Sequence, residues 1–315
     1  MTQQSSVIAA PSPVLSSHPA QSGLGWGLLG ITAFSFTVPF TRLAAHDGLS
    51  ALFIGSGRAV VAAALAAVAL LTTRQARPTM VQWWRLAVVA AGVVVGFPLL
   101  TSYALTTAPA SHGAVVIGLL PAATAAMAVL RGKERVPASF WVIAALGAAA
   151  VLAFAALQNG GLGSLHWADF LLFGAVLAAA IGYAEGGLLA RELGAWQTVS
   201  WGLVLSAPLM IALTVVSVVV ETPSGTPLQW LAFAYLCVVS MYVGFFAWYR
   251  GLAIGPMAQV SQVQLVQPVL SILWAALILR EHLTWPTVLG GLVVIACARF
   301  AVRARLGRSA HAKRR

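Results

Sequence analysis

Long apolar stretches alternate with short polar breaks along most of the 315-residue chain. A helix needs about 20 apolar residues to cross the hydrocarbon core of a bilayer. Cutting the chain at its charged and turn residues leaves stretches close to that length. They are residues 24–45, 50–72, 82–106, 109–130, 137–157, 166–190, 196–220, 228–250, 257–279 and 285–303. The pattern therefore predicts an all-α, polytopic membrane protein with ten transmembrane helices.

The two ends of the chain lie outside this pattern. Residues 1–22 are rich in Ser, Pro, Gln and Ala and contain no Lys or Arg, so they lack the basic start of a signal peptide. Their composition predicts a disordered cytoplasmic tail. Residues 304–315 form a second, basic cytoplasmic tail. Residues 23–157 and 166–303, which lie between the tails, each contain five predicted spans.

Composition supports a membrane location. The chain is 60% hydrophobic and 8% charged, whereas about a quarter of the residues of an average soluble domain are charged. The net charge of +11 comes mainly from Lys and Arg in the breaks after even-numbered spans and in the C-terminal tail. By the positive-inside rule, this distribution predicts that both termini are cytoplasmic, in a protein of the inner membrane. It does not predict a nucleic-acid-binding surface.

Residues that would indicate a cofactor or an enzyme are missing from the sequence. Cys237 and Cys297 both lie inside apolar stretches, and there is no CxxC pair or zinc-ligand spacing. The sequence contains no HExxH, GxSxG or phosphate-binding loop, so an integral membrane enzyme remains only an alternative from another class. We expect no cofactor or metal. The expected partners are a small-molecule substrate and the lipid bilayer, with the chain acting as a monomer.

The two halves match each other at a constant offset of 147 residues. The pairs include Ala33/Ala180, Leu105/Leu252, Pro109/Pro256, Pro121/Pro268, Ala128/Ala275, Leu130/Leu277 and Glu134/Glu281. A repeat of five spans is odd-numbered, so the second copy must cross the membrane in the opposite direction. Two inverted repeats of this kind build transporters that bind substrate near the midplane and rock between two conformations.

These motifs resemble the EamA-type exporters, a ten-helix family of the drug/metabolite transporter superfamily. The matching positions are Ala104-Leu105, Pro109-Ala110, Pro121, Leu130, Glu134 and Gly147 in the first half, and Gly251-Leu252, Gly255-Pro256, Pro268, Leu277, Glu281 and Gly290-Gly291 in the second. The resemblance implies gradient-driven export or exchange of metabolites, amino acids or drugs. It also implies a central cavity lined mainly by the third, fourth, eighth and ninth helices.

Glu185 is an acidic residue well inside an apolar stretch. Desolvation disfavours the ionised form of such a group, and intramembrane charges usually mark functional sites. One interpretation is proton coupling or substrate contact. The alternatives are a structural ion pair with Arg250 or Arg299, which the predicted topology places at a similar depth, and a solvated side chain that faces the cytoplasm.

Arg58 lies about 12 Å inside the second span, at 1.5 Å per residue. It could bind a substrate carboxylate through two parallel hydrogen bonds. The alternatives are a side chain that reaches outward to water, or one that caps carbonyl groups of the first helix near Pro39. Leu205 occupies the equivalent position of the second half, so Arg58 has no symmetric partner.

Polar residues of the ninth span indicate a cavity-facing surface. Gln264, Gln267 and Ser271 fall within one narrow helix face at about 100° per residue. Amide groups are costly in hydrocarbon, so this face is predicted to line the cavity, with hydrogen bonding between helices as the alternative. Further cavity candidates come from the third and eighth spans. They are Thr101, Tyr103, Trp248 and Tyr249.

The equivalent prolines Pro121 and Pro268 are the predicted hinge, with a static kink as the alternative. Glu134 and Glu281 are each predicted to cap the helix that follows or to form a local ion pair. The predicted function is a secondary transporter that exports a small metabolite, such as an amino acid or related compound, by gradient-coupled alternating access. A multidrug exporter and a metabolite antiporter are the alternatives among transporters.

Overall fold

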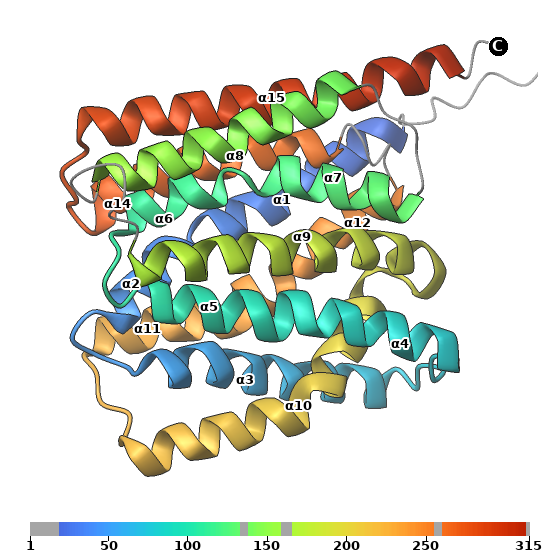
Figure 1. The fold of residues 1–315 in the computed structure, drawn as a ribbon. Helices are drawn as coiled ribbons and strands as arrows, with labels where there is room; N and C mark the ends of the chain where they lie inside the picture. Colours follow the sequence, from blue (N-terminus) through green and yellow to red (C-terminus); the bar gives the residue numbers. More distant parts are fainter. Residues whose placement is uncertain (1–18, 133–137, 159–165, 255–259, 313–315) are drawn as a thin grey trace, which may run out of the picture.

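The computed structural model describes residues 19–132, 138–158, 166–254 and 260–312. In these residues all regular structure is helical, and no strand occurs. The helices run side by side along one axis, with the turns gathered at the two ends of the bundle (Figure 1). Seven helices of the described part are long and apolar enough to cross a membrane, and three shorter apolar helices accompany them. The structure thus agrees with a polytopic, all-α membrane protein.

The elements of the first half are α1 (Pro19–Ser35), α2 (Thr37–Ala45), α3 (Ala51–Thr72), α4 (Met80–Val89), the π-helix η1 (Ala90–Gly96), α5 (Phe97–Ala104), α6 (Ala110–Ile117), α7 (Leu120–Gly132) and α8 (Ala138–Gln158). Those of the second half are α9 (Trp167–Leu193), α10 (Ala195–Val220), α11 (Pro227–Tyr235), the π-helix η2 (Leu236–Val243), α12 (Gly244–Ile254), the 3-10 helix η3 (Ser261–Leu265), α14 (Val266–Ile278) and α15 (Trp285–Ala312).

The predicted spans coincide with these elements to within a few residues except at the C-terminal end. The last span was expected to end at residue 303, but α15 continues to Ala312. Its apolar part is Trp285–Cys297. The remainder is rich in Ala and Arg, which favour helix whatever their hydropathy. Hydropathy therefore located the apolar part of this helix and not its end.

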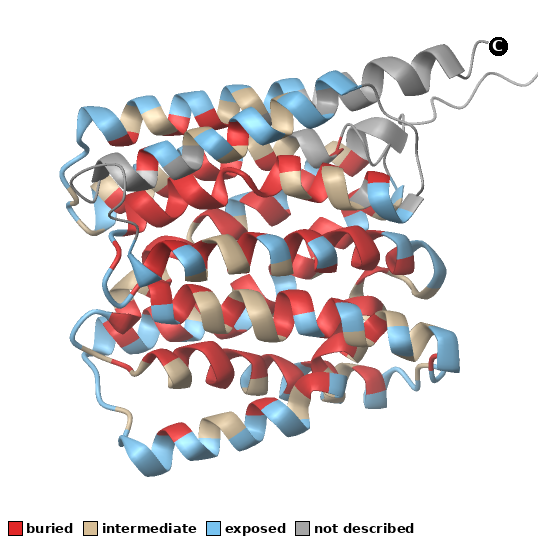
Figure 2. Ribbon diagram, viewed as in Figure 1, coloured by how far each residue is buried: buried red, intermediate tan, exposed pale blue. Residues whose placement is uncertain are grey.

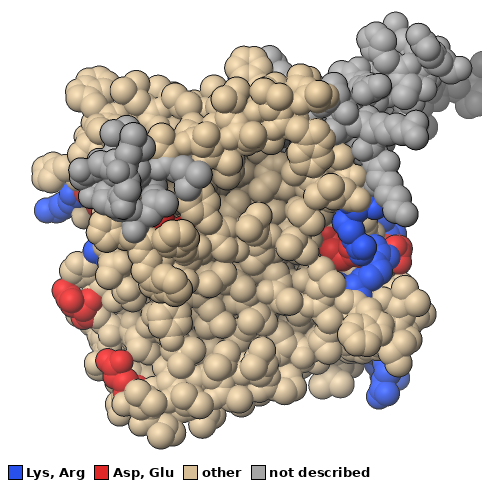
Figure 3. All heavy atoms as spheres, viewed as in Figure 1, with Lys and Arg blue, Asp and Glu red and all other residues tan. Residues whose placement is uncertain are grey.

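The outward-facing helix surfaces are apolar. Figure 2 shows buried residues concentrated in the central helices and exposed residues along the periphery, most of all on α10. Only 22% of the apolar window of α10 is buried, and Val219 and Val220 are about as exposed as any residue of that helix. Charged side chains on the face drawn in Figure 3 gather at its two ends, with a wide uncharged zone between them. That distribution suits a protein surrounded by lipid.

Pro39 interrupts the first span at Phe36, between α1 and α2. Proline has no N–H to donate to the carbonyl group of Ser35, four residues earlier. That carbonyl oxygen instead accepts a hydrogen bond of 2.7 Å from Ser271 Oγ, and the Ser35 hydroxyl accepts one of 2.9 Å from Trp274 Nε1. Residues of α14 thus satisfy the polar groups that the break in the first span exposes.

Pro121 and Pro268, the prolines predicted as a hinge, each lie just after a point where the regular helix of the span is interrupted. Pro121 follows the break between α6 and α7, and Pro268 follows the change from η3 to α14. Each lies within the first turn of its helix, where a missing N–H costs little. The two interruptions also lie against each other, because a Cβ atom placed on Gly118 would be 3.4 Å from Pro268 Cβ.

Several local features recur at the 147-residue offset. Thr79 caps α4 and Thr226 caps α11, each in a reciprocal capping box with the glutamine three residues later. Moved by 147 residues, η1 would cover 237–243, and η2 spans Leu236–Val243. The starts of α8 and α15 are related by the same offset. The two halves therefore share details of backbone conformation as well as sequence.

The π-helix η1 packs closely against α9 at Gly92. A Cβ atom on Gly92 would contact the carbonyl oxygen of Ala178 and lie 3.0 Å from the Gly182 nitrogen. These are main-chain atoms of α9, which cannot move aside as a flexible side chain would. The absence of a side chain at Gly92 therefore sets the spacing of the two elements.

We predict that Gly92→Ala lowers the free energy of unfolding by about 1–3 kcal/mol, the usual cost of overpacking a dense core. Thermal melting of the detergent-solubilised protein measures the effect. Gly202→Ala on α10 is the matched control, because the nearest atom to its added Cβ would be 3.9 Å away. Equal melting temperatures for the two variants would contradict the packing argument.

Candidate functional site

Arg58 on α3 is a cation in the interior of the bundle, with only 1% of its surface exposed. Its Nη2 donates a hydrogen bond of 3.3 Å to Thr101 Oγ1, while its Nε has no hydrogen-bond partner. In the described part of the chain no carboxylate lies within ion-pair distance of it. The side chain therefore neither extends to water nor caps the broken first helix, the two structural roles considered from the sequence.

Arg58 borders a small cavity in the middle of the bundle. Its polar lining residues are Thr37, Arg58, Tyr183, Ser240 and Gln267, and its apolar ones are Phe34, Val93, Phe97, Pro98, Met241 and Phe245. The hydroxyl groups of Thr37 and Ser240 are hydrogen-bonded to each other at 2.8 Å. The cavity has about 10 Å³ of room, which is close to the minimum for one water molecule. In this conformation the site is too small for a metabolite.

The polar face predicted for the ninth span divides into three environments. Gln267 lines the cavity. Ser271 binds the Ser35 carbonyl group and so acts between helices, the alternative that the sequence left open. Gln264 is 1% exposed, and neither atom of its amide group has a partner.

The other predicted cavity residues lie at different depths. Thr101 contacts Arg58, as described above. Tyr103 is 46% exposed, so the cavity prediction for it is wrong: a step of two residues turns it about 200° around the helix from Thr101. Trp248 and Tyr249 are fully buried between helices, where the Tyr249 hydroxyl donates to the Gly182 carbonyl oxygen at 3.3 Å. They lie outside the residues that line the cavity.

Sequence reasoning missed several lining residues. Phe34, Tyr183 and Phe245 form an aromatic wall, in which the rings of Phe34 and Phe245 are 4.8 Å apart. Thr37 lies beside the break caused by Pro39, so a proline in the first span was a usable signal. Ser240 lies in η2, and no sequence pattern indicated a π-helix there.

Glu185 lies at one end of the bundle and is 1% exposed. Arg85 Nε contacts its Oε1, and Arg131 Nη2 lies 2.5 Å from its Oε2. Arg85 also reaches Glu192 Oε1 through Nη1 at 2.5 Å. The cluster of Glu185, Arg85, Arg131 and Glu192 joins α9 to α4 and α7, and Figure 3 shows charges of both signs together at that end of the molecule.

The partners expected for Glu185 were wrong. Arg250 lies over the ring of Trp26, 5.1 Å from its centroid, and Arg299 is exposed. The reason is helix adjacency: α4 and α7 pack against α9 and bring their arginines to it. A single sequence does not indicate which helices are neighbours.

At the opposite end of the bundle, charged side chains satisfy the ends of helices. Glu281 accepts hydrogen bonds from the backbone N–H groups of Ala110 (2.7 Å) and Ser111 (2.9 Å), and so caps α6. The predicted capping role is therefore observed, but on a helix of the other half rather than the one that follows. Arg42 Nη1 donates to the carbonyl oxygens of Leu105 and Thr106 at the end of α5. Glu134 lies outside the described residues.

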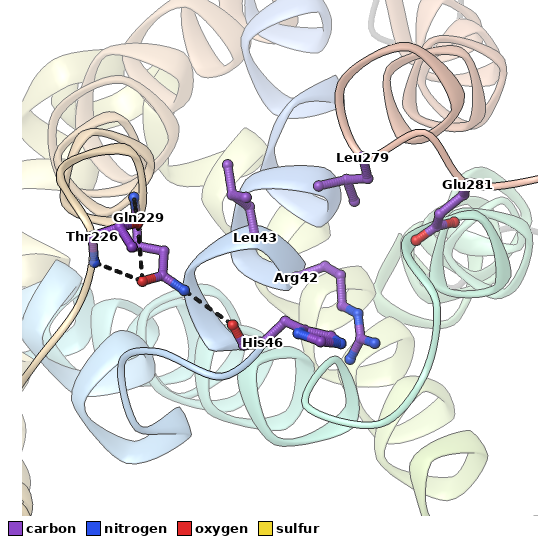
Figure 4. A pocket seen from close by; sticks show the side chains of 7 residues that line it. All are labelled: Arg42, Leu43, His46, Thr226, Gln229, Leu279 and Glu281. Carbon is purple, nitrogen blue, oxygen red and sulfur yellow. Dashed lines mark hydrogen bonds between the residues drawn. The ribbon is translucent and has the colours of Figure 1, made fainter.

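A hollow of about 370 Å³ opens at this end. Figure 4 shows Arg42 and Glu281 on one side of it and Gln229 on the other, with His46 between them. The Gln229 amide nitrogen donates to the His46 carbonyl oxygen at 3.0 Å. The hollow lies between the end of the first span, the start of α11 and the turn that follows α14.

A buried pair of a histidine and an aspartate lies near the same end. It was not recognised from the sequence. His112 Nε2 is 2.7 Å from Asp169 Oδ1, and Asp169 Oδ2 accepts a hydrogen bond of 2.9 Å from the His166 backbone N–H. His112 and Asp169 are 6% and 1% exposed, and they join α6 to α9. Both border a hollow of about 200 Å³. Each residue lies near the end of a predicted span, and no pattern in the sequence connected the two.

Comparisons with known proteins agree with this architecture. The sequence profile of the EamA-like transporter family matches residues 21–156 and again residues 166–303. The chain is 44% identical over 286 residues to an uncharacterized transporter, YdeK, of Bacillus subtilis (strain 168), covering 89% of this chain and 97% of the relative. A crystal structure of a protein without a stated activity has a TM-score of 0.61 at 19% identity, over 92% of this chain and 99% of that one. Similarity at that identity supports the fold alone.

We predict that Glu185→Gln lowers the free energy of unfolding by about 1–3 kcal/mol, because it leaves two arginines without their shared counter-ion. Glu192→Gln is the matched control. Its carboxylate is 46% exposed, and an exposed pair contributes about 0–1 kcal/mol. Melting curves in detergent compare the two variants. A larger loss for Glu192→Gln would contradict the central position assigned to Glu185.

Proposed function

This chain belongs to the EamA-like transporter family, and we propose that it is a secondary transporter that exports a small metabolite, an amino acid or related compound, across the inner membrane. The observation that carries the proposal is that the family profile matches both halves of the chain, on either side of a closed polar cavity. A carrier needs a site near the middle of the membrane and two halves that can rearrange around it.

We propose that the chain crosses the membrane ten times as two inverted five-helix repeats. The recurrences at 147 residues support a repeat, and the capping boxes at Thr79 and Thr226 belong to helices that begin at opposite ends of the bundle (Figure 1). The start of α1 and the end of α15 lie at one end, which also carries Arg77 and Arg131. Under the positive-inside rule this is the cytoplasmic end.

We propose alternating access as the mechanism. At the cytoplasmic end, the cluster of Glu185, Arg85, Arg131 and Glu192 joins three helices. At the other end, contacts of Arg42, Glu281 and the His112–Asp169 pair join the first, fourth and sixth spans to their neighbours. With both ends held and the cavity nearly filled, the conformation fits an occluded carrier without substrate. Opening either end requires one set of contacts to separate.

We propose that the interruptions near Pro121 and Pro268 act as the hinge. They lie at equivalent positions of the two halves and contact each other through Gly118. Backbone that is already released from regular hydrogen bonding can change its dihedral angles without breaking further helix. Rotation there would move α7 and α14 relative to the helices that precede them.

The proposed gradient coupling needs a titratable group that water can reach in one conformation. Glu185 was one candidate, but both of its oxygens contact arginines, so we assign it to holding the cytoplasmic end closed. His112 and Asp169 border the hollow of about 200 Å³ at the other end, and we propose this pair as the coupling site instead. A cationic-drug pump is less well supported, because the central cavity is lined by one arginine and no carboxylate among the described residues.

Transport by the purified protein in liposomes is the direct test. A labelled metabolite pool is supplied outside, with and without a proton gradient, and the compounds retained inside are identified by mass spectrometry. We expect at least one small metabolite to accumulate above the level in protein-free liposomes, and more so with the gradient. If no compound is retained under either condition, the proposed function is wrong.

Labelling of single cysteines tests the inverted arrangement. Arg77→Cys and Ser224→Cys replace exposed residues at equivalent positions of the two halves, in a background lacking Cys237 and Cys297. We expect a membrane-impermeant maleimide added outside intact cells to label Ser224→Cys. It should label Arg77→Cys only after the cells are permeabilised. Labelling of both variants from the same side would exclude inverted repeats.

A further inference from the structure

We propose that the cavity at Arg58 binds the carboxylate of a monoanionic substrate whose remaining body is uncharged and apolar, such as an arylated 2-oxo or 2-hydroxy acid. The inference rests on the proposed transport function and narrows its substrate class. It distinguishes such an acid from a zwitterionic amino acid of the same shape.

The first argument is charge balance. Arg58 is buried without an acidic partner in the described part of the chain. Six of the seven acidic residues of the protein are described, and each is either engaged elsewhere or exposed. Glu185 contacts two arginines, Asp169 pairs with His112, Glu281 caps α6, and Asp47, Glu192 and Glu221 are exposed. None of the six described acidic residues pairs with Arg58, and a bound anion would supply the missing counter-charge.

The second argument is the supply of hydrogen-bond donors. Arg58 Nε has no partner, and its Nη2 makes one long bond of 3.3 Å. Thr101 Oγ1 already donates to the Phe97 carbonyl oxygen at 2.6 Å, so it can only accept from Arg58. The planar guanidinium group thus retains adjacent donors in the geometry that a carboxylate accepts through two bonds.

The third argument is that no carboxylate occurs among the described residues of the cavity to pair with an ammonium group. The other polar side chains among the described lining residues are Thr37, Tyr183, Ser240 and Gln267, all of them uncharged. An ammonium group held a few ångströms from the Arg58 guanidinium would be repelled in a medium of low dielectric constant. A carbonyl or hydroxyl group at the same place could instead hydrogen-bond to Gln267.

The rest of the cavity selects the body of the substrate. Phe34, Tyr183 and Phe245 pack against one another, and Phe97 and Met241 complete the apolar lining. Aromatic side chains of this kind favour flat apolar groups, which they contact by edge or by stacking. Because the cavity now has room for about one water molecule, the substrate must enter as these side chains separate during opening.

Three probes that share a benzyl group but differ in charge test whether the site selects an anion. Phenylpyruvate is an anion, phenylalanine is a zwitterion and phenethylamine is a cation at neutral pH. Liposomes containing the full-length protein are loaded with each unlabelled probe, and uptake of the same labelled probe is measured at equal pH on both sides. We expect phenylpyruvate to exchange at least tenfold faster than phenylalanine, and phenethylamine not to exceed protein-free liposomes.

Two variants test whether Arg58 binds the substrate carboxylate. Arg58→Gln is expected to slow phenylpyruvate exchange at least tenfold. Arg250→Gln also removes one positive charge, but from an exposed residue that lies over Trp26, and it should exchange at the wild-type rate. Melting temperature with and without phenylpyruvate gives a second measurement, because a ligand that binds only the folded state raises it. Wild-type protein should show the rise and Arg58→Gln should not, even though the variant itself folds.

Each contrary outcome has a separate meaning. Phenylalanine exchange equal to or faster than phenylpyruvate exchange would overturn the anion proposal and leave the transport function intact. An Arg58→Gln variant that exchanges and is stabilised like the wild type would overturn the assignment of the site to Arg58. If phenylpyruvate neither exchanges nor stabilises while other metabolites of the pool are transported, the substrate class is wrong. Failure of every metabolite would count against the transport function itself.

Discussion

The absence of water from the hydrocarbon core is the constraint on which the rest of this structure depends. Every polar group at membrane depth must find its partner within the protein. The Ser35 carbonyl group, released by Pro39, obtains one from Ser271. The first N–H groups of α6 obtain theirs from Glu281. These contacts cross between distant segments, so the repair of local breaks also holds the helices together. The Gln264 amide group and Arg58 Nε are among the exceptions, and Arg58, which carries a charge, lines the cavity.

Charge and packing are divided along the axis of the bundle. Ion pairs lie at its two ends, where separation exposes them to water and costs comparatively little. The middle contains aromatic and small residues, two helix interruptions in contact and a cavity with almost no free volume. The opening at either end that we propose would therefore not expose charged groups to lipid. The same division keeps the centre dry, so interactions made there are stronger than they would be in water.

Hydropathy predicted the helical elements well because the thickness of a bilayer imposes a single length on them. Internal comparison predicted the prolines that accompany the helix breaks, since equivalent positions of the two halves carry the same residue. The contacts between helices were not accessible in this way. The partners of Glu185 and the helix capped by Glu281 depend on which helices are adjacent, and one sequence without relatives does not contain that information. The π-helices were also invisible, because their composition is as apolar as that of the α-helices around them.

These two π-helices bear on the ancestry of the protein. A π-turn closes a ring one residue larger than an α-turn, so a segment of it holds a residue that a regular helix of the same length would not need. Both copies of the EamA-like domain carry that extra residue at corresponding places, in η1 and in η2. Two independent insertions at one place are a less economical history than a single one. The shared place of η1 and η2 is the pattern expected if one π-helix was already present before the domain was duplicated.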